Sequence, residues 1–332
     1  MKHAKHRGAA LLTAMLTVTL VATFASAALW QQWRGVEIEA AERSRTQMQW
    51  VLNGALDWSR LILQEDARGK TDVDHLSEPW ALPLQEARLS SFLAMDKDHT
   101  DDAMDAFLSG QISDQQALLN VRNLVQDGKP AATATKAFER LFILLNLPRA
   151  QLQLVIDGLV ASDAATATVN APAADAKPAE AQGEAPLKPY RLEQLVWLGL
   201  PRATVQALAP YAVLLPVATP VNVNTASVEV LRAAVPDFDM ARAQQLVAQR
   251  ATTHFESVTE ALRAAGVNST SLPTDALNGL SVRTQYFAVR GRLRLGESTV
   301  QEVSLVERNG GSTKVIWRQR ENPAAPALAS LQ

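Results

Sequence analysis

Hydrophobic residues near the N-terminus predict one long helix with two different surroundings. Residues 9–30 carry no charged side chain, and at 1.5 Å per residue such a helix is roughly 33 Å long, close to the thickness of the hydrocarbon core of a bilayer. After Trp30, apolar residues recur on one face at helical spacing, and no proline occurs before Pro79. We therefore expect a helix from Ala9 to about Gln64, with its first half in lipid and its second half packed on a domain.

The charges at this end predict the orientation of the helix. Lys2, Lys5 and Arg7 precede the uncharged run without any acidic residue, which favours a cytoplasmic N-terminus with the bulk of the chain across the membrane, in the periplasm of a bacterium. We therefore expect a single-pass protein of the bacterial inner membrane. The alternative is a secretory signal peptide cleaved after residues 25–27, Ala-Ser-Ala, although the helical pattern beyond Trp30 favours a retained anchor.

The middle of the chain changes from strand-like to helical patterns. Residues 106–125 contain two strand-like runs around Asp114-Gln115-Gln116, which indicates a sheet packed on the long helix. Residues 126–280 are mainly helical in spacing. Within them, residues 162–189 hold ten Ala and four Pro in 28 positions, which predicts a flexible loop.

The C-terminal part returns to strands. Apolar and polar residues alternate over residues 281–317, with turn residues at 296–297 and 309–311, and this pattern predicts three antiparallel strands. The order of long helix, small sheet, large helical block and second sheet predicts an α+β fold in which the helical block is an insertion. The expected segments are a leader (1–8), the membrane part of the helix (9–30), the first part of the α+β domain (31–125), the inserted helical domain (126–280), the C-terminal strands (281–320) and a disordered tail (321–332).

The composition argues against several classes of protein. Of 332 residues, 32 are Lys or Arg and 34 are Asp or Glu, a net charge of -2, which lacks the basic excess of proteins that neutralise many phosphates. No cysteine occurs, so the chain has neither a disulfide framework nor a thiolate nucleophile. His75, His99 and His254 are isolated, and no paired-histidine zinc motif or Gly-x-Ser-x-Gly elbow is present. We therefore expect neither an enzyme nor a nucleic-acid partner.

One acidic cluster raises the question of calcium, because hard cations prefer several carboxylate oxygens. Its members are Asp96, Asp98, Asp101, Asp102 and Asp105. An EF-hand loop that began at Asp96 would need glycine at its sixth position and glutamate at its twelfth, where this chain has Asp101 and Phe107. We therefore interpret the cluster as a solvated loop.

The N-terminal residues resemble those of type IV pilin-like proteins. A basic leader ends at Gly8, an uncharged run begins with 9-AALL-12, and a helical pattern follows without a break. The resemblance implies that a prepilin peptidase cleaves after Gly8 and methylates Ala9. Most members carry glutamate at the fifth mature position, which is Thr13 here, and that carboxylate is thought to pair with the terminal amine of a neighbouring subunit. The type II secretion system protein K family lacks this glutamate and is placed at the filament tip, so Thr13 favours that family.

Three further segments are similar to the protein K family. They are 221-VNVNTASVEVL-231, which contains Asn222, Asn224, Thr225 and Ala226, the pair Asn120 and Asn123, and the segment from Ser281 to Val289. In the first segment we expect Asn222 and Asn224 to bond to nearby backbone, and Thr225 or Asn224 to cap a helix. The resemblance implies a pilin-like domain, with a long transmembrane helix packed on a small antiparallel sheet, that is interrupted by a large inserted all-α domain.

The resemblance also implies a function. It is that of a non-enzymatic minor pseudopilin at the tip of the type II secretion pseudopilus, which nucleates assembly and helps drive folded exoproteins through the outer-membrane secretin. Its implied partners are the minor pseudopilins I, J and H, the major pseudopilin, the prepilin peptidase and the inner membrane. Some family members bind calcium, which implies a calcium site without assigning its ligands.

Two alternative functions stay open. One is a periplasmic protein released by signal peptidase. The other is a DNA-binding helix-hairpin-helix protein, since the Asn-Thr-Ala segment also resembles such modules. Residues 221–270 hold four Arg and five acidic residues, and this net charge of -1 disfavours a polyanionic partner.

Overall fold

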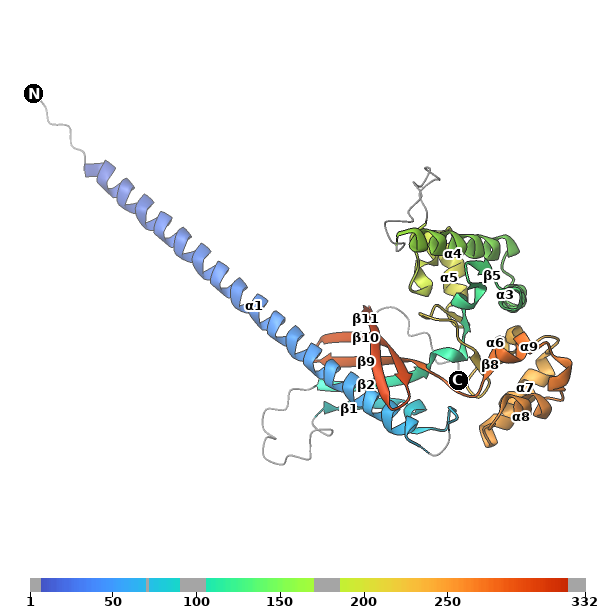
Figure 1. Ribbon diagram of the computed structural model, residues 1–332. Coiled ribbons are helices and arrows are strands. Elements are labelled where there is room, and N and C mark those ends of the chain that lie inside the picture. Colours follow the sequence, from blue (N-terminus) through green and yellow to red (C-terminus); the bar gives the residue numbers. More distant parts are fainter. Residues whose placement is uncertain (1–6, 70–71, 90–105, 170–185, 322–332) are drawn as a thin grey trace, which may run out of the picture. The chain divides into compact units, whose positions relative to one another are not determined.

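The computed structural model describes residues 7–69, 72–89, 106–169 and 186–321 (Figure 1). The chain divides into two compact units, Met1–Gly54 and Ala55–Gln332. One helix, α1 (Arg7–Ala67), begins in the first unit and ends in the second. The long helix expected from the apolar spacing is therefore confirmed.

In the first unit, α1 presents an apolar surface along the helix. From Ala10 onward the helix is long and apolar enough to cross a membrane, with a mean hydropathy of 1.9 over its most apolar 18 residues. Its hydroxyl groups bond to carbonyls of the preceding turn, as Thr17 does to Ala14 at 2.9 Å and Ser26 to Ala22 at 2.8 Å. Polar atoms of this segment are thus satisfied within the helix, as a segment in lipid requires.

The second unit contains a five-stranded antiparallel sheet. The strand order is β1 (Leu84–Arg88), β2 (Ala106–Asp114), β9 (Tyr286–Leu295), β10 (Ser298–Asn309) and β11 (Ser312–Glu321). Strands β9 to β11 confirm the three strands expected near the C-terminus. Because β2 pairs with β9 along its length, the chain between them is an insertion into one sheet. We call residues 55–114 and 282–321 the sheet domain and residues 115–281 the helical insertion.

The end of α1 packs on one face of this sheet. The apolar core between them consists of Leu56, Leu63, Trp80, Ile112, Phe287, Val289 and Val306. Trp80, from the short 3-10 helix η1 (Pro79–Ala81), is 1% exposed, and its ring meets the ring of Phe287 edge-on with centroids 5.1 Å apart. This geometry is a favourable one for aromatic pairs, so it fixes the segment after α1 against β9.

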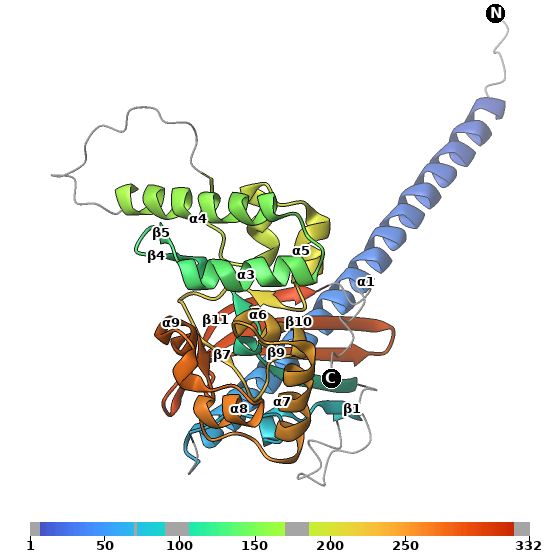
Figure 2. The same cartoon turned by 90° about the vertical axis from the view of Figure 1, so that its right-hand side faces the viewer.

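The helical insertion consists of short helices and two-residue strands around a second core. Figure 2 shows α3, α4 and α5 in one group and α6 to α9 in another, and one continuous apolar cluster joins residues of both groups. The elements are η2 (Gln115–Ala117), β3 (Leu119–Asn120), η3 (Val121–Leu124), β4 (Val125–Gln126), β5 (Lys129–Pro130), α3 (Ala132–Leu144), α4 (Arg149–Val169), η4 (Leu192–Leu198), α5 (Arg202–Leu208), β6 (Ala212–Val213), β7 (Val221–Asn222), α6 (Val228–Ala234), α7 (Met240–Thr252), α8 (Val258–Ala264), η5 (Ser269–Ser271), α9 (Thr274–Asn278) and β8 (Leu280–Ser281). The sheet and the insertion together confirm the expected α+β fold class.

The second strand expected within residues 106–125 is wrong. After β2 the chain forms η2, the two-residue β3 and η3 instead of a strand. The Asp114 carboxylate accepts a hydrogen bond from the Gln116 N–H at 2.6 Å, and the Asn120 side chain accepts one from the Arg122 N–H at 3.0 Å. Such side-chain bonds to nearby backbone compete with an extended ladder and turn the chain.

The loop expected from residue 162 begins later than predicted. Helix α4 continues through residues 162–169, because alanine, which is frequent there, has the highest helix propensity. In this extension Asp163 lies 2.8 Å from the Lys188 ammonium and accepts a hydrogen bond from Arg122 at 3.0 Å. Residues 170–185 of the expected loop and residues 322–332 of the expected tail lie outside the described residues, whereas Glu321 is the last residue of β11.

Candidate functional site

The processing residues predicted from the sequence lie at the start of α1. Gly8 and Ala9 fall within its first turn. The Thr13 hydroxyl donates a hydrogen bond to the Ala10 carbonyl at 3.0 Å. A hydroxyl at this position is uncharged, so it cannot present the negative charge that a carboxylate would offer to a neighbouring amine.

The Asn-x-Asn-Thr-Ala residues are buried where the helical insertion meets the sheet domain. Asn222, Asn224 and Ala226 are at most 1% exposed and Thr225 is 8% exposed. Strand β7 pairs in parallel with β8, with Asn222 opposite Ser281, which brings this motif beside the chain that leads into β9. The motif is therefore a structural junction, closed to solvent.

Asn224 holds the loop between α7 and α8. Its amide nitrogen donates to the Phe255 carbonyl at 2.9 Å, and its amide oxygen accepts from the Phe255 N–H at 3.0 Å. The Arg250 guanidinium donates to the Val223 carbonyl next to it at 2.7 Å. The expectation that Thr225 or Asn224 caps the following helix is wrong: the cap of α6 is Ser227.

Asn222 lies at the centre of a buried hydrogen-bond network with Asp114. The Asn222 amide nitrogen lies 3.1 Å from the Asp114 carboxylate, 3.1 Å from the Asp74 carbonyl and 3.0 Å from the Thr284 hydroxyl. The same Asp114 oxygen accepts hydrogen bonds from the hydroxyls of Thr225 at 2.5 Å and Thr284 at 2.7 Å. One carboxylate thus joins β2, the motif and the entry to β9.

A buried guanidinium from β10 completes this junction on the side of α1. Arg308 donates to the carboxylates of Asp66, at 2.5 Å, and Asp74, and to the Thr284 carbonyl at 2.9 Å. Its side chain is 9% exposed, and those of Asp66 and Asp74 are 13% and 5% exposed. Because a buried charge is costly unless it is paired, each of these three groups depends on the others.

Burial shifts the acids of this junction toward their neutral forms. Burial raises the pKa of Asp114 to about 6, although hydrogen bonds from Thr225, Thr284 and the Gln116 N–H oppose the change. Burial also raises the pKa of Glu78 to about 7. The pKa values of Asp66 and Asp74 are raised by burial, and the charge of Arg308 offsets part of the change. The junction therefore holds more acids than its one cation can neutralise.

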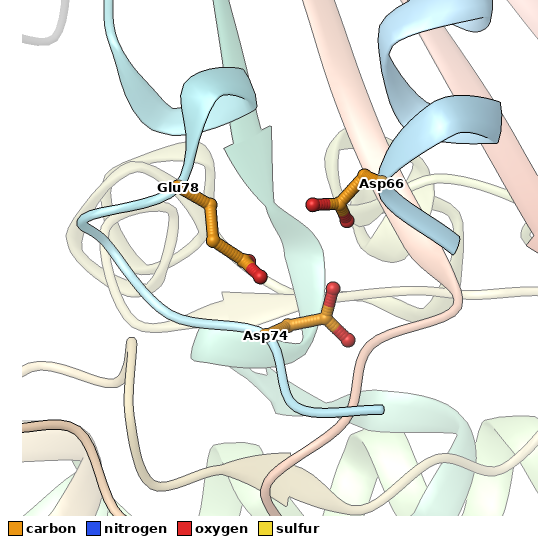
Figure 3. Close-up of side chains that lie close together, drawn as sticks. All are labelled: Asp66, Asp74 and Glu78. Atoms are coloured by element: carbon orange, nitrogen blue, oxygen red, sulfur yellow. The ribbon is translucent and has the colours of Figure 1, made fainter. Parts of the chain in front are cut away.

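Figure 3 shows the carboxylates of Asp66, Asp74 and Glu78 converging, and oxygens of the three lie within 4.8 Å of one another. Most of these oxygens already accept hydrogen bonds. Arg308 donates to Asp66 and Asp74, while Glu78 accepts from the Trp80 indole at 2.6 Å and from the His75 N–H at 3.0 Å. Calcium takes six to eight oxygen ligands, so this arrangement fits a guanidinium better than a metal. The acidic cluster Asp96 to Asp105 lies outside the described residues.

Asn120 and Asn123 form a second clamp of the same kind. The Asn120 amide donates to the Val217 carbonyl at 2.7 Å and accepts from the Leu215 N–H at 3.1 Å. The Asn123 amide donates to the Thr219 carbonyl at 2.7 Å and accepts from the Thr219 N–H at 3.0 Å. Both asparagine side chains thus satisfy backbone N–H and C=O groups in the segment that leads to the Asn-x-Asn-Thr-Ala motif.

The turn between α6 and α7 is poorly suited to a phosphate. Asp237 adopts a left-handed conformation with φ of 53°, and Asp239 caps α7 by accepting from the Arg242 N–H at 2.8 Å. Two acidic side chains therefore lie in the turn that a nucleic-acid backbone would approach, and they would repel its phosphates. Arg250, one of the four arginines of this segment, is committed to the Val223 carbonyl.

Sequence reasoning did not predict the charged residues that surround the Asn-x-Asn-Thr-Ala motif. Asp74, Asp114, Thr284 and Arg308 carry no local motif, and strands and loops far apart in the chain bring them together. One signal was available: on β10 the alternation that places Val306 in the core also places Arg308 on the same face. An arginine at an inward position predicts buried acidic partners.

Comparison with known proteins gives a consistent match. Two family models, each described as type II secretion system (T2SS) protein K, match residues 117–217 and 221–283. The chain is 27% identical to type II secretion system protein K of Pseudomonas aeruginosa over 96% of this chain and 94% of that protein. It is 26% identical to the protein of the same name from Pectobacterium carotovorum over 95% of this chain and 96% of that protein.

A solved structure shares the fold. It belongs to the GspK-GspI-GspJ complex of the enterotoxigenic Escherichia coli type 2 secretion system. The TM-score is 0.61 at 20% sequence identity, and the match covers 85% of this chain and 98% of that one. The likeness therefore extends through both the sheet and the insertion.

Proposed function

Because this chain belongs to the type II secretion system protein K family, we propose that it is a minor pseudopilin at the tip of the type II secretion pseudopilus. There it nucleates assembly and helps drive folded exoproteins through the outer-membrane secretin. The observation that carries this proposal is the match to protein K over 96% of the chain, from the apolar helix to the last strands. We infer no catalytic role.

The apolar helix supports anchoring by a single membrane span. A helix with a mean hydropathy of 1.9 over 18 residues is suited to lipid. Lys2, Lys5 and Arg7 precede it, and we propose that they keep the N-terminus in the cytoplasm while the bulk of the chain lies in the periplasm. The membrane is then the bacterial inner membrane.

Two features support a place at the tip. Thr13 replaces the acidic side chain with which most pilin-like subunits dock beneath a neighbour, and its hydroxyl bonds within its own helix. The helical insertion between β2 and β9 adds bulk that side-by-side packing in a filament would have to accommodate. A terminal subunit avoids both difficulties.

The proposed partners are other pilin-like subunits. The similar structure is that of a complex named for GspK, GspI and GspJ, and we propose that the present chain assembles with the corresponding minor pseudopilins I and J. We extend the proposal to minor pseudopilin H, the major pseudopilin and the prepilin peptidase. A calcium site is part of the proposal, with no ligands assigned to it.

The decisive experiment is mass spectrometry of the mature N-terminus from bacterial membranes. We expect the chain to start at a methylated Ala9. The variant Gly8→Ala should leave the full-length precursor, while Gly35→Ala, at a helical glycine with nothing within 4 Å of an added Cβ, should be processed normally. A mature chain that starts at Ala28 would show release by signal peptidase and would refute the proposal.

A further inference from the structure

Two histidines stack at the contact between the sheet domain and the helical insertion. His75 belongs to the segment between α1 and η1, and His254 belongs to the loop between α7 and α8. Their ring centroids are 3.8 Å apart and their planes differ by 6°. Both side chains are partly buried, so a charge on either ring would lie directly against the other ring.

The hydrogen bonds of His75 require its neutral form. The Nδ1 atom accepts a hydrogen bond from the Ser77 N–H at 3.3 Å, so in the neutral ring the proton is on Nε2, which lies 3.9 Å from the Glu78 carboxyl. Protonation of Nδ1 would convert this acceptor to a donor facing the Ser77 N–H. The bond would then be lost at the same time as the ring became charged.

The charged groups around the pair do not compensate for this cost. Glu78 is the acid nearest to His75, but burial raises the pKa of Glu78 to about 7, so Glu78 becomes neutral before His75 takes up a proton. Burial, with the charge of His254, lowers the pKa of His75. Of the neighbouring acids, Asp66 and Asp74 are paired with Arg308, Asp72 is paired with Arg283, and Glu256 and Glu260 are exposed on the α8 side.

The two loops have different attachments besides the stack. The His75 loop is tied down by the Asp74 N–H, which donates to the Val282 carbonyl at 2.8 Å, and by the Asn222 amide on the Asp74 carbonyl. The His254 loop is tied to the motif through Phe255 and Asn224. Loss of the stack would therefore separate the His254 loop from the His75 loop, while the bond from Asn222 to the Asp74 carbonyl still joins the helical insertion to the sheet domain.

We propose that the His75–His254 stack is an acid-sensitive clasp between the sheet domain and the helical insertion. At neutral pH His75 is uncharged and the clasp is closed. In acid His75 becomes charged against the His254 ring, loses the hydrogen bond from the Ser77 N–H and releases the α7–α8 loop from the segment after α1. The α7–α8 loop then gains local freedom, while the bonds of Asn222 and Thr225 to Asp114 still hold the helical insertion on the sheet domain.

The test is hydrogen–deuterium exchange of the full-length chain in detergent at pH 7.5 and pH 5.0, with intrinsic rates corrected and with EDTA present. One proton linked to opening changes the opening constant by up to tenfold per pH unit. We therefore expect exchange in peptides that contain Ser77 and Phe255 to rise by at least about tenfold in acid. Peptides from β9 and β10 serve as the internal reference and should stay protected.

Two variants make the test specific. The double variant His75→Phe with His254→Phe keeps two stacked rings that do not titrate, and it should show no acid step at these peptides. If that variant does not fold, His75→Gln serves the same purpose, because it removes the ring whose protonation opens the clasp. An acid step of equal size in the variants, or no step in the unaltered chain, would overturn the proposal. A step that appears only without EDTA would also overturn it, because it would indicate a bound metal ion.

Discussion

Removal of the Thr225 hydroxyl tests the buried junction most directly. This hydroxyl donates to the Asp114 carboxyl at 2.5 Å, and burial raises the pKa of that carboxyl from 3.8 to about 6 while the Thr225 bond lowers it. The variant Thr225→Val keeps the shape of the side chain and removes the donor. The pKa of Asp114 should therefore rise further.

The magnitude follows from the linkage between protonation and folding. Because the folded pKa of Asp114 exceeds the unfolded one, its stabilising contribution is complete below pH 3.8 and is lost as the pH rises through about 6. The difference, about 6 less 3.8, is roughly two pKa units, so the ionised buried group costs about 3 kcal/mol at high pH. A hydrogen bond to a charged group contributes about 1.5–3 kcal/mol and one to a neutral group about 1 kcal/mol.

The expected result is a pH-dependent loss of stability. Thr225→Val should lower the free energy of unfolding by about 2–3 kcal/mol at pH 8 but by only about 1 kcal/mol at pH 4.5. Urea unfolding of the full-length chain in detergent, followed by tryptophan fluorescence, measures both values. Thr259→Val, at an exposed position on α8, is the matched control and should show little change at either pH. A loss that is the same at both pH values, or larger in acid, would refute the account of Asp114.

Two further substitutions test the packing around the junction and within the insertion. Arg308→Met should lower the free energy of unfolding by about 3–5 kcal/mol at pH 7, because it leaves the Asp74 carboxylate buried without its counter-ion. The same urea assay should show a smaller loss of stability in acid. A loss that does not depend on pH would contradict the pairing of Arg308 with Asp74. Gly158→Ala should destabilise the chain by about 1–3 kcal/mol in thermal unfolding, since the new Cβ would meet the Leu198 Cβ at 3.0 Å. Gly54→Ala, where an added Cβ has nothing within 4 Å, should instead stabilise α1 by about 0.5–1 kcal/mol. Changes in stability of the same sign at both glycines would argue against the close approach of Leu198 to Gly158.

Local patterns in the sequence were sufficient for the regular elements. The uncharged run after Gly8 and the helical spacing beyond it led to α1, and the alternation after Ser281 led to β9, β10 and β11. These predictions succeeded because a helix or a hairpin is determined by residues that are close in the chain. The same reasoning failed at residues 115–125 and 162–169, where bonds from side chains to nearby backbone and the helix propensity of alanine outweighed the average pattern.

The amide motif could be recognised from the sequence, but its partners could not. Asn222 and Asn224 stand out as a motif, whereas Asp74, Asp114 and Arg308 carry no signal that links them to it. Their pairing depends on the position of β2 beside β9 and on the return of the chain through β7 and β8.

By itself, the amino-acid sequence determined the apolar helix, the α+β class and the resemblance to the protein K family, because each depends on residues near one another or on a recognisable motif. Only the tertiary structure decided which acids share Arg308, that burial raises the pKa of Asp114 and that His75 meets His254. The physical reason is that burial and long-range contact set the energy of a charge, and neither can be read from its neighbours in the chain.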